Sequence, residues 1–277
     1  MKVKDYLNEY IHESRGRLSQ ASIERYQRSY KALNRFLGDF ELKDLSSRVL
    51  TKFACQRLED GLKPESVNID LRHIKAALKR AERWELIDKP VFIEMVKTPK
   101  RIPRHLSESE FRSIIEAESY PKFRRLWIFL LWTAVRRNEA LNLTWERVFY
   151  GDNPHIRVVG KGDVERVVPL LPPAIKALGK HRRTGLVFHF KNPTQVTKHF
   201  KVTAQKAGLG EHRLHDLRHT GITRMVGQGL PLKLVQEFAG HATILTTMNY
   251  AKIFSGDSYK TLMKAFGFKD GAVKPGK

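Results

Sequence analysis

The stretch "HDLRHT", residues 215–220, places two histidines around one arginine at the predicted start of a helix. Histidine is a weak helix former, and a cluster this cationic is unfavourable in a protein core. One interpretation is a solvated basic face in a basic protein. The other is a pocket that holds an anion, and the remaining sequence favours this second interpretation.

The chain carries a large excess of positive charge. Its 277 residues include 51 Lys and Arg against 29 Asp and Glu, which gives a net charge of +22, and 41% of the residues are hydrophobic. This length suits one large domain or two modest ones. A surplus of this size favours a polyanionic partner, with nucleic acid as the first choice. A membrane surface is the rival, but we find neither an amphipathic anchor nor a lipidation signal, and we expect no membrane partner.

The sequence also indicates a compartment. The opening "MKVKDYLNEY", residues 1–10, lacks the apolar stretch of a signal peptide. The longest apolar run, "LWIFLLWTAV" at 126–135, is too short for a bilayer, which needs ~20 residues, so we expect a buried helix there. The single cysteine, Cys55, excludes an intramolecular disulfide and a multi-cysteine metal site. We therefore expect a cytoplasmic protein.

Residues 1–96 predict a small helical domain that binds DNA. Apolar spacing and end signals place four helices at about 3–13, 19–38, 47–61 and 64–84. The second and fourth helices each oppose an apolar stripe with a basic face. These basic residues are Arg25, Arg28 and Arg35 on the second helix and Arg72, Lys79, Arg80 and Arg83 on the fourth. A solvated face explains any one of them equally well, but two basic faces in one small bundle favour phosphate contact.

Residues 97–106 have the composition of a linker, with two prolines and several charges, and residues 107–277 predict a second domain. Ser107 and Glu110 have the spacing of a capping box that opens a helix. Alternating residues on either side of "GKGD" predict a β-hairpin. Its strands are expected at 155–159 and 164–170, and helices at 107–118, 122–135, 172–178, 194–207, 215–228, 231–239, 243–250 and 257–266. The fold class is mainly α with a small β-hairpin or sheet, which makes the second domain α+β.

Breaking a DNA strand without a metal requires three kinds of group. A nucleophile must attack phosphorus, positive charge must stabilise the nonbridging oxygens, and the leaving 5′ oxygen needs a proton. Tyrosine can form a covalent ester, the planar fork of arginine binds two phosphate oxygens, and histidine or lysine can donate the proton. The sequence contains Arg136, Glu139, Lys161 at the hairpin turn, His215 and Arg218 on one helix face, His241, and Tyr250 nine residues later.

Each of these residues alone has an ordinary structural explanation, such as an ion pair, a turn or a core position. We expect His219 to be a packing or supporting residue. In their order and spacing, however, "TAVRRNE", "GKG", "HDLRHT", "AGH" and Tyr250 resemble the motifs of the tyrosine recombinases, also called phage-integrase or Xer-like site-specific recombinases. The resemblance covers about 104–266, and the front half is similar to the family's SAM-like core-binding domain with less specific sequence. Ala134 departs from the family, which usually has Gly there.

The resemblance implies a role for each residue. His215 would transfer a proton, Arg136 and Arg218 would clamp the phosphate, Lys161 would protonate the leaving 5′ hydroxyl, His241 would bond a phosphate oxygen, Tyr250 would attack, and Glu139 would orient the site from behind. The product would be a 3′-phosphotyrosyl bond, and strand exchange would pass through a Holliday junction. No metal or other cofactor is expected, because the sequence contains no metal-ligand cluster and no phosphate-binding glycine loop.

The resemblance also implies partners. These are double-stranded DNA with a short inverted-repeat core site, and further copies of the chain as a dimer on each site and a tetramer in synapsis. A second recombinase or an accessory factor stays open. The helix expected at 257–266 would pack either on a neighbouring protomer or on its own domain. Because the front bundle begins almost at residue 1, we expect no additional arm-binding domain.

Two other functions stay open at this point. A type IB topoisomerase shares the same catalytic logic but relaxes DNA without strand exchange. A DNA-binding protein that has kept the fold without the chemistry is the second alternative. The biological role is equally open, because integration or excision of a mobile element, transposon resolution and resolution of chromosome dimers all use the same catalytic machinery.

Overall fold

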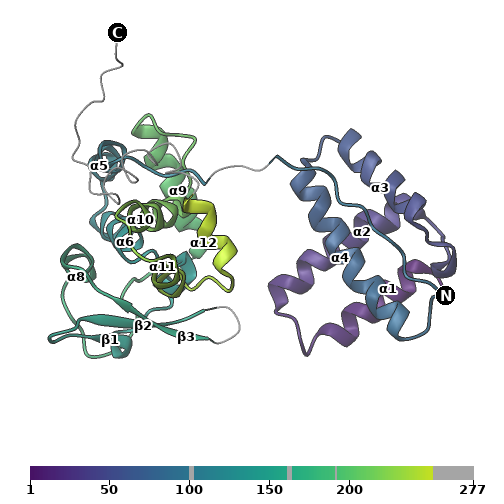
Figure 1. Cartoon of the computed structure of the whole chain (residues 1–277), viewed down its shortest axis with the longest axis horizontal. Coiled ribbons are helices and arrows are strands. Elements are labelled where there is room, and N and C mark those ends of the chain that lie inside the picture. The colour runs from purple at the N-terminus through teal and green to yellow at the C-terminus, as the bar shows by residue number, and fades with distance from the viewer. Residues whose placement is uncertain (100–102, 161–163, 191, 252–277) are drawn as a thin grey trace, which may run out of the picture. The chain divides into compact units, whose positions relative to one another are not determined.

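The computed structural model describes residues 1–99, 103–160, 164–190 and 192–251. The chain divides into two compact units, Met1–Lys100 and Arg101–Lys277, each with its own hydrophobic core (Figure 1). Among the described residues, no helix is both long enough and apolar enough to cross a bilayer.

The first unit is the four-helix bundle that the sequence predicts. Its helices are α1 (Val3–Ser14), α2 (Gln20–Leu37), α3 (Ser47–Glu59) and α4 (Pro64–Arg83), with the short 3-10 helix η1 (Leu42–Asp44) between α2 and α3. Gly38 is the C-cap of α2 and has a φ of +64°, a conformation that glycine adopts readily. Two tyrosine hydroxyls reach α4 from other helices: Tyr6 donates to the carbonyl of Ala77, and Tyr30 to that of His73.

The basic residues of this unit lie on its surface. Arg25, Arg28 and Arg35 of α2 and Arg72, Lys79 and Arg83 of α4 are exposed, whereas Arg80 is half-buried with its guanidinium 5.1 Å from the ring of Trp84. Arg25 of α2 and Arg72 of α4 both contribute to lowering the pKa of His73, after burial of the ring itself. Both arginines therefore lie close enough to His73 for their charge to act on its ring.

The second unit is mostly helical and has one small sheet. Its elements are α5 (Glu108–Ala117), α6 (Pro121–Thr133), α7 (Arg137–Leu141), η2 (Trp145–Arg147), β1 (Val148–Phe149), β2 (His155–Val159), β3 (Glu165–Pro169), α8 (Pro172–Leu178), α9 (Pro193–Lys206), α10 (Leu214–Gly227), α11 (Leu232–Ala239) and α12 (Ile244–Ala251). The sheet is antiparallel with the order β1-β2-β3. The predicted hairpin is confirmed, and so is the capping box, in which the Ser107 amide donates to Glu110 Oε2 at 2.7 Å.

Helix α6 lies at the centre of this unit, because it is apolar on nearly every side. Leu126, Trp127 and Phe129 are fully buried, which confirms that the apolar run is a buried helix. Helix α10 packs against α6 at Gly221, where a Cβ atom would collide with the backbone carbonyl of Leu131. A glycine is therefore required for the close approach that brings "HDLRHT" to the end of α6.

Three short elements of the second unit were not predicted. Strand β1 has two residues, η2 has three and helix α7 has five, so none is long enough to show a period in the sequence. The helix expected at 257–266 lies outside the described residues.

Candidate active site

Arg136 lies at the corner between α6 and α7. The corner is formed by Ala134, which is buried and has a φ of +48°, a left-handed conformation that glycine adopts more readily. Arg136 then starts α7: its amide donates to Glu139 Oε2 at 2.7 Å, and its guanidinium donates to Glu139 Oε1 at 2.8 Å. Glu139 thus fixes both the backbone and the side chain of Arg136.

Glu139 also binds a second arginine, which the sequence analysis missed. Arg166 of β3 donates to both carboxylate oxygens of Glu139, at 3.0 and 2.8 Å. Burial of the Glu139 carboxylate raises its pKa, but the hydrogen bonds from Arg166 and Arg136 outweigh burial and lower the pKa to about 2. The carboxylate is therefore charged throughout the physiological range, and it holds two arginines side by side.

Arg218 of α10 is the most deeply buried of the site's arginines. Its side chain is 3% exposed, and it donates to the carbonyls of Ala134 and Ala239. Burial and the nearby positive charge of Arg136 lower the pKa of Arg218 to about 10, so it stays charged at neutral pH. Its contacts join the end of α6 to the end of α11.

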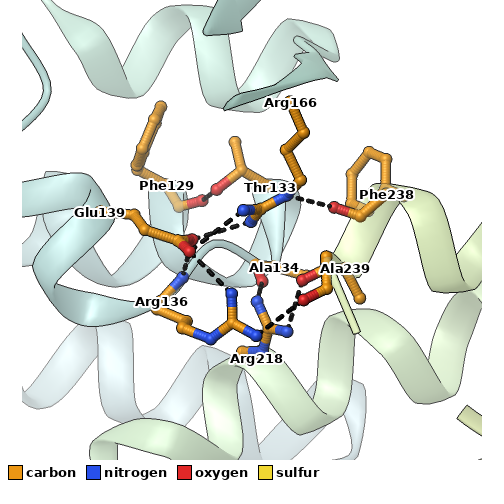
Figure 2. Close-up of polar contacts among 10 residues, drawn as sticks. Phe129, Thr133, Ala134, Arg136, Glu139, Arg166, Arg218, Phe238 and Ala239 are labelled. Carbon is orange, nitrogen blue, oxygen red and sulfur yellow. Dashed lines mark hydrogen bonds and ion pairs between the residues drawn. The ribbon is translucent and has the colours of Figure 1, made fainter. Parts of the chain in front are cut away.

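The C-terminal end of α11 holds these arginines in place. Three consecutive carbonyls each accept from a different arginine: Phe238 from Arg166 at 3.1 Å, Ala239 from Arg218 at 2.6 Å, and Gly240 from Arg136 at 2.8 Å (Figure 2). The last carbonyls of a helix have no partner within it, and the negative end of the helix dipole attracts cations. Each guanidinium has five N–H donors, so Arg136 and Arg218 keep further donors for a ligand.

Gly240 is required at this junction for two reasons. Its φ is +64°, and a Cβ atom placed on it would lie 2.8 Å from the guanidinium of Arg166. The glycine both ends α11 and leaves room for Arg166 beneath it. The chain then passes directly into His241 and α12.

His241 and Tyr250 lie on this segment. His241 Nδ1 is 2.9 Å from the hydroxyl of Thr247, and its ring is nearly parallel to that of Tyr250, with 6.1 Å between centroids. Burial and the charge of Arg218 lower the pKa of His241 to about 4, so the ring is neutral at pH 7. Tyr250 is 3% exposed, and burial raises the pKa of its phenol, an effect that Arg218 partly opposes.

The second histidine of "HDLRHT" contacts this tyrosine. His219 Nδ1 lies 2.5 Å from the Tyr250 hydroxyl, whereas His215 lies one helical turn earlier on α10 with its ring 4.6 Å from that of His219. His215 is exposed at the mouth of a recess of about 430 Å³ that Arg136 and Arg218 also line. The expectation that His219 is a packing or supporting residue therefore misses a direct contact with the tyrosine.

The structure brings together six of the residues singled out from the sequence. They are Arg136, Glu139, His215, Arg218, His241 and Tyr250. Lys161 lies outside the described residues. The seven basic residues of α2 and α4 belong to the first unit.

A signal for Arg166 was present in the sequence. Strand alternation places Arg166 on the same face of β3 as the fully buried Val168, so a charged residue there needs a partner inside the unit. The contact of His219 had a weaker signal, because only its spacing of four residues from His215 placed it on the same helix face.

A buried tyrosine beside neutral histidines and two fixed arginines suits the class of enzymes that break and rejoin DNA through a tyrosine. Comparison with known families agrees. Residues 104–256 match the phage integrase family, and residues 2–97 match the phage integrase SAM-like domain. The chain belongs to the phage integrase family: it is a tyrosine recombinase, an enzyme of site-specific DNA strand exchange.

The chain is also similar to individual tyrosine recombinases. The chain is 26% identical to the tyrosine recombinase XerC of Mesorhizobium japonicum, over 86% of each chain. It is 26% identical to the tyrosine recombinase XerD of Haemophilus influenzae, over 90% of this chain and 92% of the relative. These relatives do not favour the topoisomerase and the non-catalytic DNA-binding protein that the sequence analysis left open.

Solved structures share the fold. A lambda integrase fragment in a dimer bound to a core site superposes with a TM-score of 0.76 at 19% identity, covering 90% of this chain and 95% of the fragment. The Tn1549 transposon integrase in complex with circular intermediate DNA gives a TM-score of 0.77 at 21% identity, covering 95% of this chain and 99% of that one. The mainly helical fold with a small sheet is therefore confirmed.

Proposed function

We propose that Tyr250 is the nucleophile of strand cleavage and that Arg136 and Arg218 clamp the scissile phosphate. One observation carries this proposal: the carbonyls that fix both arginines end α11, and the same segment continues into α12 and the buried Tyr250. Negative charge that grows on the nonbridging oxygens would meet positive groups already held in place. Such preorganised charge is usually the largest contribution to catalysis.

The other residues have supporting roles. His241 donates a hydrogen bond to a phosphate oxygen from Nε2, because its Nδ1 faces Thr247. By the family resemblance His215, which lines the recess, takes part in proton transfer, and Lys161 protonates the leaving 5′ oxygen. Glu139 orients Arg136 through two hydrogen bonds. The product is a 3′-phosphotyrosyl bond and a free 5′ hydroxyl. This hydroxyl attacks the partner strand, so that strand exchange passes through a Holliday junction.

The substrate we propose is duplex DNA with a short inverted-repeat core site, bound by two protomers, with a tetramer in synapsis. The dimer of lambda integrase on a core site and its tetramer on a Holliday junction support this assembly. Arg25, Arg28, Arg35, Arg72, Lys79, Arg80 and Arg83 would contact phosphates from the first unit. We propose domain limits of 1–96 and 107–277 with a linker at 97–106, and a DNA-associated enzyme of the cytoplasm.

The biological task we propose is integration or excision of a mobile element, or resolution of DNA multimers. Integrases of a phage and of a transposon, and Xer recombinases, all resemble the chain, so both tasks stay open. An attachment repeat or mobile-element genes beside the coding sequence would favour integration. A second recombinase or an accessory factor belongs to the same question.

Covalent trapping tests the nucleophile. The protein is incubated with a pool of nicked duplexes that contain its own flanking DNA, and the mixture is denatured before the protein–DNA adduct is measured. The wild type should form an adduct, and Tyr250→Phe should bind DNA without forming one. Tyr120→Phe is the matched control, because Tyr120 is an exposed tyrosine of the same unit and its loss should leave the adduct intact. An adduct in Tyr250→Phe would move the nucleophile elsewhere.

The clamp has its own measurement in the same assay. Arg136→Ala and Arg218→Ala should each slow cleavage at least ~100-fold, the scale on which one transition-state donor acts. A loss of only a few-fold would mean that the residue does not hold the phosphate.

A further inference from the structure

The hydroxyl of Tyr250 has one close polar neighbour in the described part of the chain. His219 Nδ1 lies 2.5 Å from Tyr250 Oη, and no other hydrogen bond to that oxygen occurs among the described residues. The two side chains come from α10 and α12, which pack against each other, and their rings are 5.6 Å apart. A nucleophile must lose its proton during attack, so the group in this position is the nearest acceptor for it.

The direction of this hydrogen bond follows from the surroundings. Burial and the positive charge of Arg218 lower the pKa of His219 to about 4, so the ring is neutral at pH 7 and one of its nitrogens carries a lone pair. Burial raises the pKa of Tyr250, so the phenol keeps its proton in the free protein. A protonated phenol donates to a neutral imidazole, which assigns the lone pair to Nδ1 and the hydrogen to Nε2.

His215 lies elsewhere in the site. His215 is an exposed residue that lines the same recess as Arg136 and Arg218. Its ring is perpendicular to that of His219, with 4.6 Å between centroids, and among the described residues only His219 makes a hydrogen bond to the phenol. The two histidines of "HDLRHT" therefore face different groups: His215 faces the recess and His219 faces the nucleophile.

We propose that His219 is the general base of strand cleavage, a role that rests on Tyr250 being the nucleophile. As Tyr250 Oη forms its bond to phosphorus, the phenol proton passes to His219 Nδ1, the bond from phosphorus to the 5′ oxygen breaks, and that oxygen takes its proton from Lys161, the role proposed above for that lysine. In religation the 5′ hydroxyl gives its proton to Lys161 as it attacks phosphorus, the bond from phosphorus to Tyr250 Oη breaks, and His219 returns its proton to the departing phenolate.

The same arrangement makes the base depend on substrate. The charge of Arg218 disfavours a second positive charge on His219 while the site is empty. A phosphate anion held by Arg136 and Arg218 would offset that charge and make proton transfer to His219 easier. The tyrosine would thus stay protonated until a phosphate arrives.

The first test compares leaving groups. His219→Asn places an amide near the position of Nδ1 and keeps a hydrogen-bond acceptor but not a base. The substrates are nicked duplexes with either the normal 5′ oxygen or a bridging 5′ sulfur at the scissile phosphate, because a thiolate leaves without a proton. His219→Asn should bind DNA as the wild type does and form adduct at least ~100-fold more slowly with both leaving groups, the usual scale for a general base. Lys161→Ala is the control. Its adduct formation should be slow with the normal 5′ oxygen and should recover with the 5′ sulfur.

Two results would overturn the proposal: adduct formation by His219→Asn within about fivefold of the wild-type rate, or recovery of that variant with the sulfur leaving group. Lack of an adduct with the wild type and both substrates would instead contradict the proposed function as a whole. Circular dichroism of His219→Asn and of the matched variant His215→Asn separates a folding defect from a chemical one.

A second measurement does not depend on activity. The ¹⁵N spectrum of labelled histidine side chains in the full chain reports which ring nitrogen carries the hydrogen, and His219→Asn assigns the signal. At pH 7 His219 should be the tautomer with hydrogen on Nε2, and its Nδ1 signal should shift in Tyr250→Phe. A hydrogen on Nδ1 would make His219 the donor to the phenol and would contradict its role as base.

Discussion

At the scale of single residues, one carboxylate organises the site. Glu139 accepts four hydrogen bonds, two from Arg136 and two from Arg166, although its side chain is only 5% exposed. A buried charge is tolerated in a protein only when it is paired and hydrogen-bonded. The sequence predicted that Glu139 would orient the site, but it did not reveal that a strand 27 residues away supplies half of its partners.

Arg166→Met should therefore disturb the position of Arg136, although Arg166 is not one of the residues proposed to contact the phosphate. Loss of its two bonds leaves Glu139 partly unpaired in the interior, which should cost about 3 kcal/mol in the free energy of unfolding. Adduct formation should fall about tenfold or more, because Arg136 is then held by a less firmly fixed carboxylate. Chemical denaturation and covalent trapping measure the two effects.

Arg157→Met is the control for Arg166→Met. It removes the same charge from the neighbouring strand, where the side chain is exposed and lies against the ring of Phe149. Equal losses of unfolding free energy in the two variants would show that Glu139 does not depend on Arg166.

The pKa of Glu139 predicts a dependence of stability on acid. The folded-state pKa, about 2, lies below the ordinary value of 4.5, so the folded state favours the carboxylate. This contribution is present above pH ~4.5 and is lost as the pH falls toward 2. At ~1.4 kcal/mol per pKa unit it amounts to about 3 kcal/mol. Between pH 5 and 3, wild-type unfolding free energy should fall more steeply than that of Glu139→Gln; parallel curves would mean an ordinary carboxyl.

At the scale of elements, the sequence predicted long helices well and short elements poorly. The spacing of apolar residues and the end signals placed every α-helix of the described residues except α7 within two residues of its ends. Helix α7 and strand β1 are formed by tertiary contacts instead. The contacts at the end of α11 could not be predicted either. No local sequence pattern shows that three carbonyls there accept hydrogen bonds from arginines of α7, β3 and α10.

Gly240→Ala tests that helix end. The variant must adopt a φ of +64° with a side chain, and its Cβ would lie 2.8 Å from the guanidinium of Arg166. Gly229→Ala is the matched control, because Gly229 ends α10 with a φ of +76° and has open space around it. The control should lose about 1 kcal/mol of unfolding free energy from backbone strain alone.

Gly240→Ala should lose about 1–3 kcal/mol more than that control, because Arg166 must move. It should also slow adduct formation, whereas Gly229→Ala should not. Thermal or chemical unfolding of the two variants side by side makes the comparison. Equal losses would show that the space beneath Gly240 is not needed.

At the scale of the whole molecule, the net charge of +22 is the property that composition alone revealed. Composition suggested a polyanion, and the ordered motifs then identified the chemistry. Which side chains meet could not be predicted, because contacts such as Arg218 with the end of α6 join residues 84 apart in the sequence. The structure shows such contacts within each of the two units.

The affinity for DNA should fall steeply with salt, because each phosphate contact releases counterions. For duplex DNA the logarithm of affinity should fall with the logarithm of salt by ~0.9 per contact. Replacing Arg25 and Arg72 with glutamine should reduce that slope by about two units, since both are exposed residues of the proposed basic faces and each would lose one phosphate contact. Fluorescence anisotropy over a range of salt concentrations measures it.

Lys43→Gln with Lys52→Gln is the control for the salt experiment. These exposed lysines lie on η1 and α3 of the same unit and change the net charge equally. Equal slopes for the two double variants would attribute binding to overall charge and not to the proposed basic faces.

The arginines around the end of α11 also affect how the protein can change under selection. Among the described residues, folding brings Arg136, Arg166 and Arg218 together around one paired carboxylate, that of Glu139, and the lowered pKa of Arg218 corresponds to a cost of roughly 3 kcal/mol in the folded state. Selection for heat resistance alone would favour uncharged residues at these positions. A library screened only for thermostability should therefore accumulate well-folded, inactive chains, and stabilising changes must be sought away from this site.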